Sequence, residues 1–183
     1  MDSKMRGLVR CLPYDPEWKV QFGLVRDMLA GSLGEITLAI EHVGSTSVEG
    51  LAAKPILDLD VVIATRYDLP EVERRLVTLS FFHYGDGDIP GREIFRRTFE
   101  DEFMAYHVYV CAQDSVELSQ HLAFRDWLRS HPEDRDAYGR LKTELAARFP
   151  HDIDGYMAGK HDFIQERLAR IADEENGKEE VRL

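Results

Sequence analysis

The hydrophobic and polar positions near the amino terminus follow a helical period. Apolar side chains recur at a spacing of three to four residues between about residues 15 and 30, as in an amphipathic helix. Asp15 and Pro16 supply the signals that start a helix, and Gly31 to Gly34 supply those that end one. A second helix is predicted from Asp68 to about residue 78, where Val72, Leu76 and Leu79 share one face.

Strand patterns surround that second helix. A strand is predicted over about residues 36–43, and the run ILDLDVVI at residues 56–63 has the β-branched content of another. Residues 48–55 between them are expected to form a short helix or an ordered loop. Two further strands, FRRTF and AYHVYVC, are joined by the turn EDEF, so Glu100, Asp101 and Glu102 are expected in that turn.

The last third of the chain is predicted to be helical. Ser115 caps a first helix, on which His121 and Arg125 lie one turn apart, and Pro132 opens a second helix. The third helix carries a stripe that we interpret as core: Met157, His161, Ile164, Leu168 and Ile171. From Asp173 onward the charged sequence lacks such a stripe. We therefore expect one domain over residues 1–172 and a flexible tail over residues 173–183.

This order of elements predicts the α/β class, with a mixed β-sheet flanked by helices and followed by carboxy-terminal helices. The 183 residues, 44% apolar and 31% charged, suit one soluble globular domain. No apolar run is long enough for a membrane span or a signal peptide, which predicts a cytoplasmic protein. Cys11 and Cys111 lack a metal or disulfide spacing and are expected to be free thiols.

The net charge of −11 argues against general binding to nucleic acid or to anionic membranes, which depends on lysine and arginine. A small phosphorylated substrate that arrives with a divalent cation remains compatible with this charge. The oligomeric state cannot be derived from these residues.

The candidate chemistry lies in two neighbouring segments. Asp58 and Asp60 alternate with apolar residues in the predicted strand, so both side chains point to one face, roughly 7 Å apart at the backbone. Two adjacent carboxylates predict a bound cation, Mg²⁺ or alternatively Mn²⁺, which leaves coordination positions open for phosphates. Gly44, Ser45 and Thr46 end the preceding strand with backbone N–H groups and hydroxyls that suit phosphate oxygens. Taken alone, the two aspartates are also compatible with an ordinary solvent-exposed face of a sheet, and the Gly-Ser pair with an ordinary turn.

In combination the two segments resemble a known signature. Twelve residues separate Ser45 from Asp58, and the nucleotidyltransferase superfamily has a Gly-Ser followed at about this distance by Asp-x-Asp on a strand. The wording EHVGSTSVEGLAAKPILDLDV, with LPYDPEW before it and HLAFRDWLRSHP after it, is similar to the GrpB family of small bacterial proteins over residues 12 to about 170. The resemblance implies a nucleotidyltransferase-like fold with a nucleotide site.

Four more residues are candidates for that site. Lys54 is assigned to phosphate, with a solvated lysine as the alternative. Arg96 and Arg97 alternate in their strand, so at most one faces the site; we assign Arg97, with surface arginines as the alternative. Lys160 resembles a lysine found near this point in the GrpB family, with a solvated lysine as the alternative. His107 stands in the strand where many nucleotidyltransferases have a third carboxylate, and GrpB-like sequences carry a histidine in this strand; a core histidine satisfied by hydrogen bonds is the alternative.

These residues lead to one preferred function and two alternatives. The first is Mg²⁺-dependent transfer of a nucleotidyl group from a nucleoside triphosphate to a small acceptor, with Asp58 and Asp60 as metal ligands and Asp58, Asp60 and His107 as catalytic residues. The missing third carboxylate supports the second, a catalytically weak or inactive module that binds or senses a nucleotide on the same fold. The third is a scaffold protein with a vestigial pocket. The nucleotide and the acceptor cannot be derived from the sequence.

Overall fold

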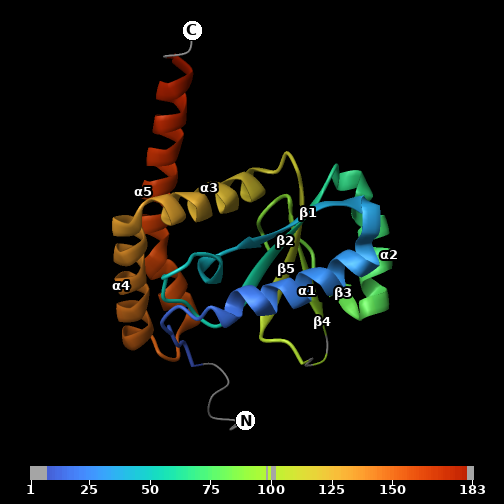
Figure 1. Cartoon of the computed structure of the whole chain (residues 1–183), viewed down its shortest axis with the longest axis horizontal. Helices are drawn as coiled ribbons and strands as arrows, with labels where there is room; N and C mark the ends of the chain where they lie inside the picture. Colours follow the sequence, from blue (N-terminus) through green and yellow to red (C-terminus); the bar gives the residue numbers. More distant parts are fainter. Residues whose placement is uncertain (1–7, 98, 100–101, 181–183) are drawn as a thin grey trace.

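A five-stranded mixed sheet forms the centre of the computed structural model, which describes residues 8–97, 99 and 102–180 (Figure 1). The strand order is β1-β2-β5-β4-β3, in which the β2–β5 pair is parallel and the other three pairs are antiparallel. The strands are β1 (Thr37–Val43), β2 (Leu57–Ile63), β3 (Phe81–His83), β4 (Arg92–Arg97) and β5 (Tyr106–Ala112). The expected α/β class and mixed sheet are confirmed.

The central strand β2 separates two layers. Its side chains alternate between faces, and Leu57, Leu59, Val61 and Ile63 join the main core with residues of helices α1 (Glu17–Leu33) and α2 (Leu69–Leu76). On the opposite face Val62 packs against Leu118 of helix α3 (Val116–Ser130). Asp58 and Asp60 share that second face, so α3 covers the strand on the side where the carboxylates lie.

Three carboxy-terminal helices form a layer of their own. Helices α4 (Pro132–Arg148) and α5 (Ile153–Glu180) pack together with α3 around Trp127, Leu128 and Tyr138. Val48 and Leu51, from the loop between β1 and β2, reach into this cluster. Figure 1 shows α4 and α5 stacked beside one end of the sheet, while the last part of α5 extends away from the body. The loop therefore connects the sheet to the helical layer.

Local signals explain where most of these elements begin. The Asp15 carboxylate accepts a hydrogen bond from the Glu17 backbone N–H at the start of α1, at 2.9 Å. Ser115 caps α3 by accepting from the Leu118 N–H at 3.2 Å, as expected. Asp68, expected to cap α2, instead accepts from the backbone N–H and hydroxyl of Thr65. The Asp68 carboxylate therefore caps the 3₁₀ turn Arg66–Asp68 that precedes α2, and not α2 itself.

Two further expectations differ from the structure at the carboxy-terminal end. Residues 173–180, predicted as a tail, continue α5 as helix. The apolar stripe of α5 is not all core, because Met157 and His161 are exposed while Ile171 is buried. The predicted positions of Glu100 and Asp101 lie outside the described residues. Cys11 and Cys111 are free thiols. Within the described ranges, no helix combines the length and apolarity needed to cross a bilayer.

Candidate functional site

Strand β1 ends in a turn that brings the backbone close to a carboxylate. Gly44 has φ +67°, which favours glycine, and a 3₁₀ turn over Ser45–Ser47 follows. A Cβ atom at Gly44 would overlap Oδ2 of Asp58 on the neighbouring strand. Ser47 donates its hydroxyl hydrogen to the Gly44 carbonyl at 2.6 Å and fixes the turn. The absence of a side chain at Gly44 is therefore what leaves room for the Asp58 carboxylate.

Asp58 is the accessible member of the aspartate pair. It pairs with Val43 on β1 and with His107 on β5. Its Oδ1 lies 2.9 Å from Nδ1 of His107, and the two side chains are 31% and 44% exposed. The two strands that flank β2 thus orient Asp58 from both sides.

Asp60 has the opposite environment. Its side chain is fully buried, and Oδ2 lies 2.7 Å from Nδ1 of His121 on α3. The other ring nitrogen of His121 lies 3.1 Å from Oε1 of Glu117, one turn earlier on the helix. Oδ1 of Asp60 is buried and has no hydrogen-bond partner within the described part of the chain. A buried carboxylate oxygen without a partner is a position for a cation or a water molecule.

The Asp60–His121 pair holds its proton strongly. Burial raises the pKa of Asp60, although the hydrogen bond and the charge of His121 oppose that shift. Burial by itself lowers the pKa of His121, but the hydrogen bond and charge of Asp60, with the charge of Glu117, outweigh it and raise the pKa. Both directions favour a state in which the pair keeps one proton.

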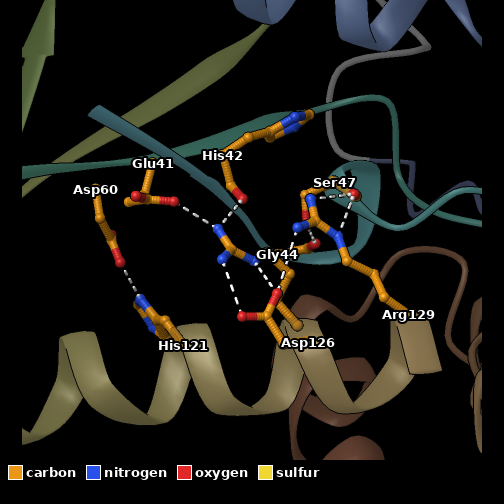
Figure 2. A network of polar contacts seen from close by, with 9 residues as sticks. Glu41, His42, Gly44, Ser47, Asp60, His121, Asp126 and Arg129 are labelled. Atoms are coloured by element: carbon orange, nitrogen blue, oxygen red, sulfur yellow. Dashed lines mark hydrogen bonds and ion pairs between the residues drawn. The ribbon is translucent and has the colours of Figure 1, made fainter. Parts of the chain in front are cut away.

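Two arginines attach α3 to the strands that carry the site. Nη1 of Arg125 donates to Oε2 of Glu41 at 2.7 Å and to the His42 carbonyl at 3.2 Å. Nη2 of Arg129 donates to the Ser47 carbonyl at 2.9 Å. Figure 2 shows Glu41, Ser47 and Asp60 facing the helix that carries His121 and Arg129. These contacts fix α3 over the carboxylate face of the sheet.

A pocket of about 470 Å³ opens between the β1 turn, the α3 surface and α5. Its lining includes polar residues of the turn, β2 and α5, among them Ser45, Asp58 and Lys160. It also includes apolar side chains of α3 and α5: Phe124, Leu128, Ile164 and Leu168. A ligand with a charged group and an apolar or aromatic group fits such a mixed lining.

The structure brings together most, but not all, of the residues predicted for the site. Gly44, Ser45, Asp58 and Lys160 line the pocket, His107 contacts Asp58, and Asp60 lies behind His121. Lys54 is not a lining residue but lies near Lys160, since both ammonium groups stand over the Tyr156 ring, at 5.9 and 4.7 Å from its centroid.

Thr46 and Arg97 are not brought to the pocket. Thr46 is buried, and its hydroxyl contacts His42 and the Ile56 carbonyl. Arg97 donates to the Leu79 carbonyl and lies over the Phe81 ring, which belongs to the opposite core. Arg92, on the other face of the same strand, lines the pocket instead and lies 3.6 Å from Glu117. The alternation of side chains along β4 explains why the two arginines separate.

The sequence analysis missed the roles of three side chains on α3, although a signal was present. Glu117, His121 and Arg125 follow one another at steps of four residues, as does Arg129. Polar residues at this spacing form one stripe on a helix. Such a stripe on a helix expected to pack against a sheet indicates contact with buried polar groups.

The residues present fit a small hard cation. Asp58 and Asp60 offer carboxylate oxygens, which Mg²⁺ and Mn²⁺ prefer, and Oδ1 of Asp60 has no protein partner among the described residues. Within the same residues no cluster of three or more His, Cys, Asp or Glu side chains is arranged as a metal site. The protein thus offers two carboxylates, and other ligands would come from water or substrate.

Comparison with known proteins now identifies the family. The model of the family described as GrpB protein matches residues 8–170. The chain belongs to the GrpB family. UPF0157 protein BH1888 of Halalkalibacterium halodurans is 33% identical over 166 residues, which cover 88% of this chain and 82% of that protein. UPF0157 protein YqkA of Bacillus subtilis is 31% identical over 157 residues, covering 86% of this chain, and this chain spans 45% of its length.

Solved structures agree with this family and with its fold. A crystal structure of conserved protein GrpB from Enterococcus faecalis matches with a TM-score of 0.80 and 32% identity, over 90% of this chain and 98% of that one. The GLD-2/RNP-8 complex matches with a TM-score of 0.56 and 18% identity, over 81% and 58% of the two chains. The Cid1 poly(U) polymerase gives 0.50 and 14%, over 73% and 40%. The last two likenesses show that this GrpB protein has a nucleotidyltransferase-like fold.

Proposed function

We propose that this GrpB protein is a metal-dependent nucleotidyltransferase that uses a nucleoside triphosphate and a small acceptor. The observation that carries the proposal is the close approach of the Gly44 backbone to Asp58, beside a second carboxylate on the same strand face. A phosphate turn next to paired carboxylates is the arrangement that a metal-bound triphosphate requires. The pocket's mixed polar and apolar lining suits a nucleotide.

In this reaction an acceptor oxygen forms a bond to the α-phosphorus, the bond to the bridging oxygen breaks, and pyrophosphate leaves. Gly44 and Ser45 hold phosphate oxygens through backbone N–H groups and a hydroxyl. Asp58 and Asp60 would hold Mg²⁺ or Mn²⁺, which neutralises phosphate charge and aligns the reacting oxygens. Lys160 lines the same pocket, and its positive charge would stabilise the pyrophosphate that leaves.

His107 and His121 orient the two carboxylates. Each histidine nitrogen contacts one oxygen of its aspartate, at 2.9 Å for Asp58 and 2.7 Å for Asp60. The second oxygen of each carboxylate is then directed by the protein before any ligand arrives, which is how residues behind metal ligands act. His107 lies beside Asp58, and both side chains are partly exposed. An acceptor that reaches Asp58 would therefore also come within reach of His107.

A nucleotide-binding module without turnover is the second candidate. It is favoured by the lack of a three-ligand cluster in the described part of the chain and by the full burial of Asp60. Such a module would use the same pocket and the same phosphate turn. The two candidates differ in whether pyrophosphate is released.

The deciding experiment measures pyrophosphate release from a panel of nucleoside triphosphates with pooled small acceptors. We expect metal-dependent release by the parent, reduced in Asp60→Asn by more than the roughly 10- to 100-fold typical of residues behind a metal ligand. His107→Ala should also lower activity without unfolding the sheet. The matched control is Asp27→Asn, which makes the same chemical change at a side chain that is 69% exposed on α1.

Metal-dependent release that persists unchanged in Asp60→Asn would contradict the assigned site. Absence of release by the parent across the panel, with triphosphate binding retained, would favour the binding module. Calorimetric titration of nucleotide with and without Mg²⁺ separates binding from turnover, because the site proposed at Asp58 and Asp60 predicts tighter binding with the metal.

A further inference from the structure

Lys142 of α4 is a buried lysine. Its residue is 1% exposed, and its Nζ has no hydrogen-bond partner among the described residues. The ammonium group lies 4.5 Å from the centroid of the Tyr138 ring. A cation–π contact contributes about 0.5–2 kcal/mol, less than the cost of removing an ammonium group from water. The surrounding fold alone therefore does not compensate this charge.

Two more lysines are connected to Lys142, because Lys160 acts on Lys142 and Lys54 acts on Lys160. Lys54 comes from the loop before β2 and Lys160 from α5, and both ammonium groups lie over the Tyr156 ring. Burial lowers the pKa of Lys142 to about 7, and the charge of Lys160 adds to this shift. Burial likewise lowers the pKa of Lys160 to about 8, with a contribution from Lys54. Three segments thus bring together amino groups that repel one another.

Asp58 is the carboxylate whose charge acts on all three lysines. One carboxylate does not balance three ammonium groups, and Asp58 also contacts His107. Lysines that repel one another in two pairs, Lys142 with Lys160 and Lys160 with Lys54, contribute little to packing that apolar side chains would not contribute at lower cost. An anion with several negative charges would supply the missing partner.

The pocket gives such an anion a place to bind. Lys160 and Tyr138 both line it, together with Ser45 of the turn after β1. The Lys142 ammonium group lies over the aromatic ring of Tyr138. Lys160 thus lines the pocket itself, Lys142 contacts the lining residue Tyr138, and Lys54 shares the Tyr156 ring with Lys160.

We propose that Lys54, Lys142 and Lys160 form a binding site for a compact oligophosphate anion, with the Lys142 ammonium group as its most buried contact. An oligophosphate carries several charges on neighbouring phosphates, which matches three cations next to a phosphate turn better than a single carboxylate does. We take the terminal phosphates of a nucleoside triphosphate as the physiological ligand, and this identification rests on the proposed function. The site itself is defined by the lysines and needs neither metal nor nucleoside.

The first test titrates inorganic pyrophosphate and tripolyphosphate into the full chain by calorimetry, with a chelator present. We expect tripolyphosphate to bind, and Lys142→Met to weaken it by at least about 10-fold, the effect of losing one charged hydrogen bond. The control is Lys19→Met, which removes an exposed lysine paired with Glu49 on the surface and should leave binding unchanged. Asp58→Asn should tighten this metal-free binding, because it removes a negative charge beside the lysines.

The second test uses thermal unfolding. Without ligand, Lys142→Met should be at least as stable as the parent, because methionine fills similar space without an unpaired charge. Tripolyphosphate should raise the melting temperature of the parent more than that of the variant. A lysine that served the fold alone would give the opposite order without ligand.

The proposal is overturned if neither inorganic anion binds the parent, or if Lys142→Met binds tripolyphosphate like the parent. Failure of the proposed function is a separate result. Tripolyphosphate binding without any nucleotidyl transfer would refute the transferase and leave the lysine site standing. Transfer without metal-free binding of the anion would do the reverse.

Discussion

Asp58 and Asp60 stand on one face of one strand but differ in their surroundings. The side chain of Asp58 is 31% exposed, whereas that of Asp60 is fully covered by α3. The different environments separate the roles of chemically identical groups. Asp58 lies where a ligand in the pocket would meet it, and under the proposed function Asp60 would hold the cation from the buried side.

Gly44 is the residue at which a small change should have the largest local effect. Gly44→Ala adds a methyl group that overlaps Oδ2 of Asp58, in a backbone conformation with φ +67°. We expect stability to fall by roughly 1–3 kcal/mol from the strain and triphosphate binding to fall by at least 10-fold, about 1.4 kcal/mol. Chemical denaturation and calorimetric titration measure the two effects.

The matched control is Gly23→Ala, in α1, where no other atom lies within 4 Å of the added methyl group. Alanine in a helix interior should stabilise the protein by up to about 1 kcal/mol. A Gly44→Ala variant that is as stable as the parent and binds triphosphate equally would show that the turn does not hold phosphate.

At the residue scale, the sequence predicted what local geometry decides. The shared face of Asp58 and Asp60 follows from strand alternation, and the glycine turn from its position after β1. The burial of Asp60 and the isolation of Lys142 depend on how α3 and α4 dock, and no nearby residue signals this. The sequence alone does not show which face of β4 meets the pocket, because this depends on the register of β4 with β5. For that reason the sequence analysis could assign Arg97 to the site although its side chain lies on the opposite face.

Helix α3 connects the sheet to the carboxy-terminal helices. Its polar stripe contacts β1, β2 and the turn after β1, while its apolar side packs against α5 through Leu128 and its neighbours. Because α3 contacts both layers, it sets where the carboxy-terminal helices lie relative to the sheet. The geometry of the pocket therefore depends on the docking of this single element.

Arg125→Met tests that connection. The Arg125 side chain is 11% exposed and Glu41 is 34% exposed, so the pair is partly shielded from water. Its loss also leaves the His42 carbonyl without this donor. We expect the free energy of unfolding to fall by about 1–3 kcal/mol, measured by urea denaturation.

The comparison variant is Arg26→Met, whose ion pair with Asp27 is exposed on α1. It should change stability by less than about 0.5 kcal/mol. If both variants lose the same amount, the contact between α3 and β1 contributes no more than a surface ion pair.

The elements themselves were largely predictable, because each carries its own period and its own end signals. The two strands around the phosphate turn, α1 and the three final helices occur where the pattern indicated. The strand order was not predictable, since the parallel pairing of β2 with β5 joins segments far apart in the sequence. The continuation of α5 beyond Asp173 was missed because those residues have no apolar stripe.

The stability of the whole molecule should decrease in mild acid because of His42. This side chain is buried, stacks on Phe22 and contacts Thr46. Burial lowers its pKa from 6.5 to about 4, and Arg129 and Arg125 add to the shift. The unfolded chain therefore binds a proton below pH 6.5 that the folded chain does not bind until about pH 4, so folding stability is lost as the pH falls through this window.

The shift corresponds to about 3 kcal/mol between pH 6.5 and 4. Urea denaturation at several pH values measures the effect. Between pH 6.5 and 4 the free energy of unfolding of His42→Gln should fall by about 3 kcal/mol less than that of the parent. His151→Gln, at an exposed position, should follow the parent. Equal pH dependence in the parent and His42→Gln would mean that His42 is protonated in the folded protein.

The pocket is assembled from segments far apart in the sequence, and this has a consequence during synthesis. The Gly44 turn and the aspartates emerge from the ribosome before His121, and His121 before Lys160, since proteins are made from the amino terminus. Until α3 arrives, the carboxylate that ends up fully buried has neither its helix nor its histidine. A polypeptide that has not yet grown past α5 therefore lacks part of the pocket wall, and under the proposed function it could not bind the ligand as the folded protein does.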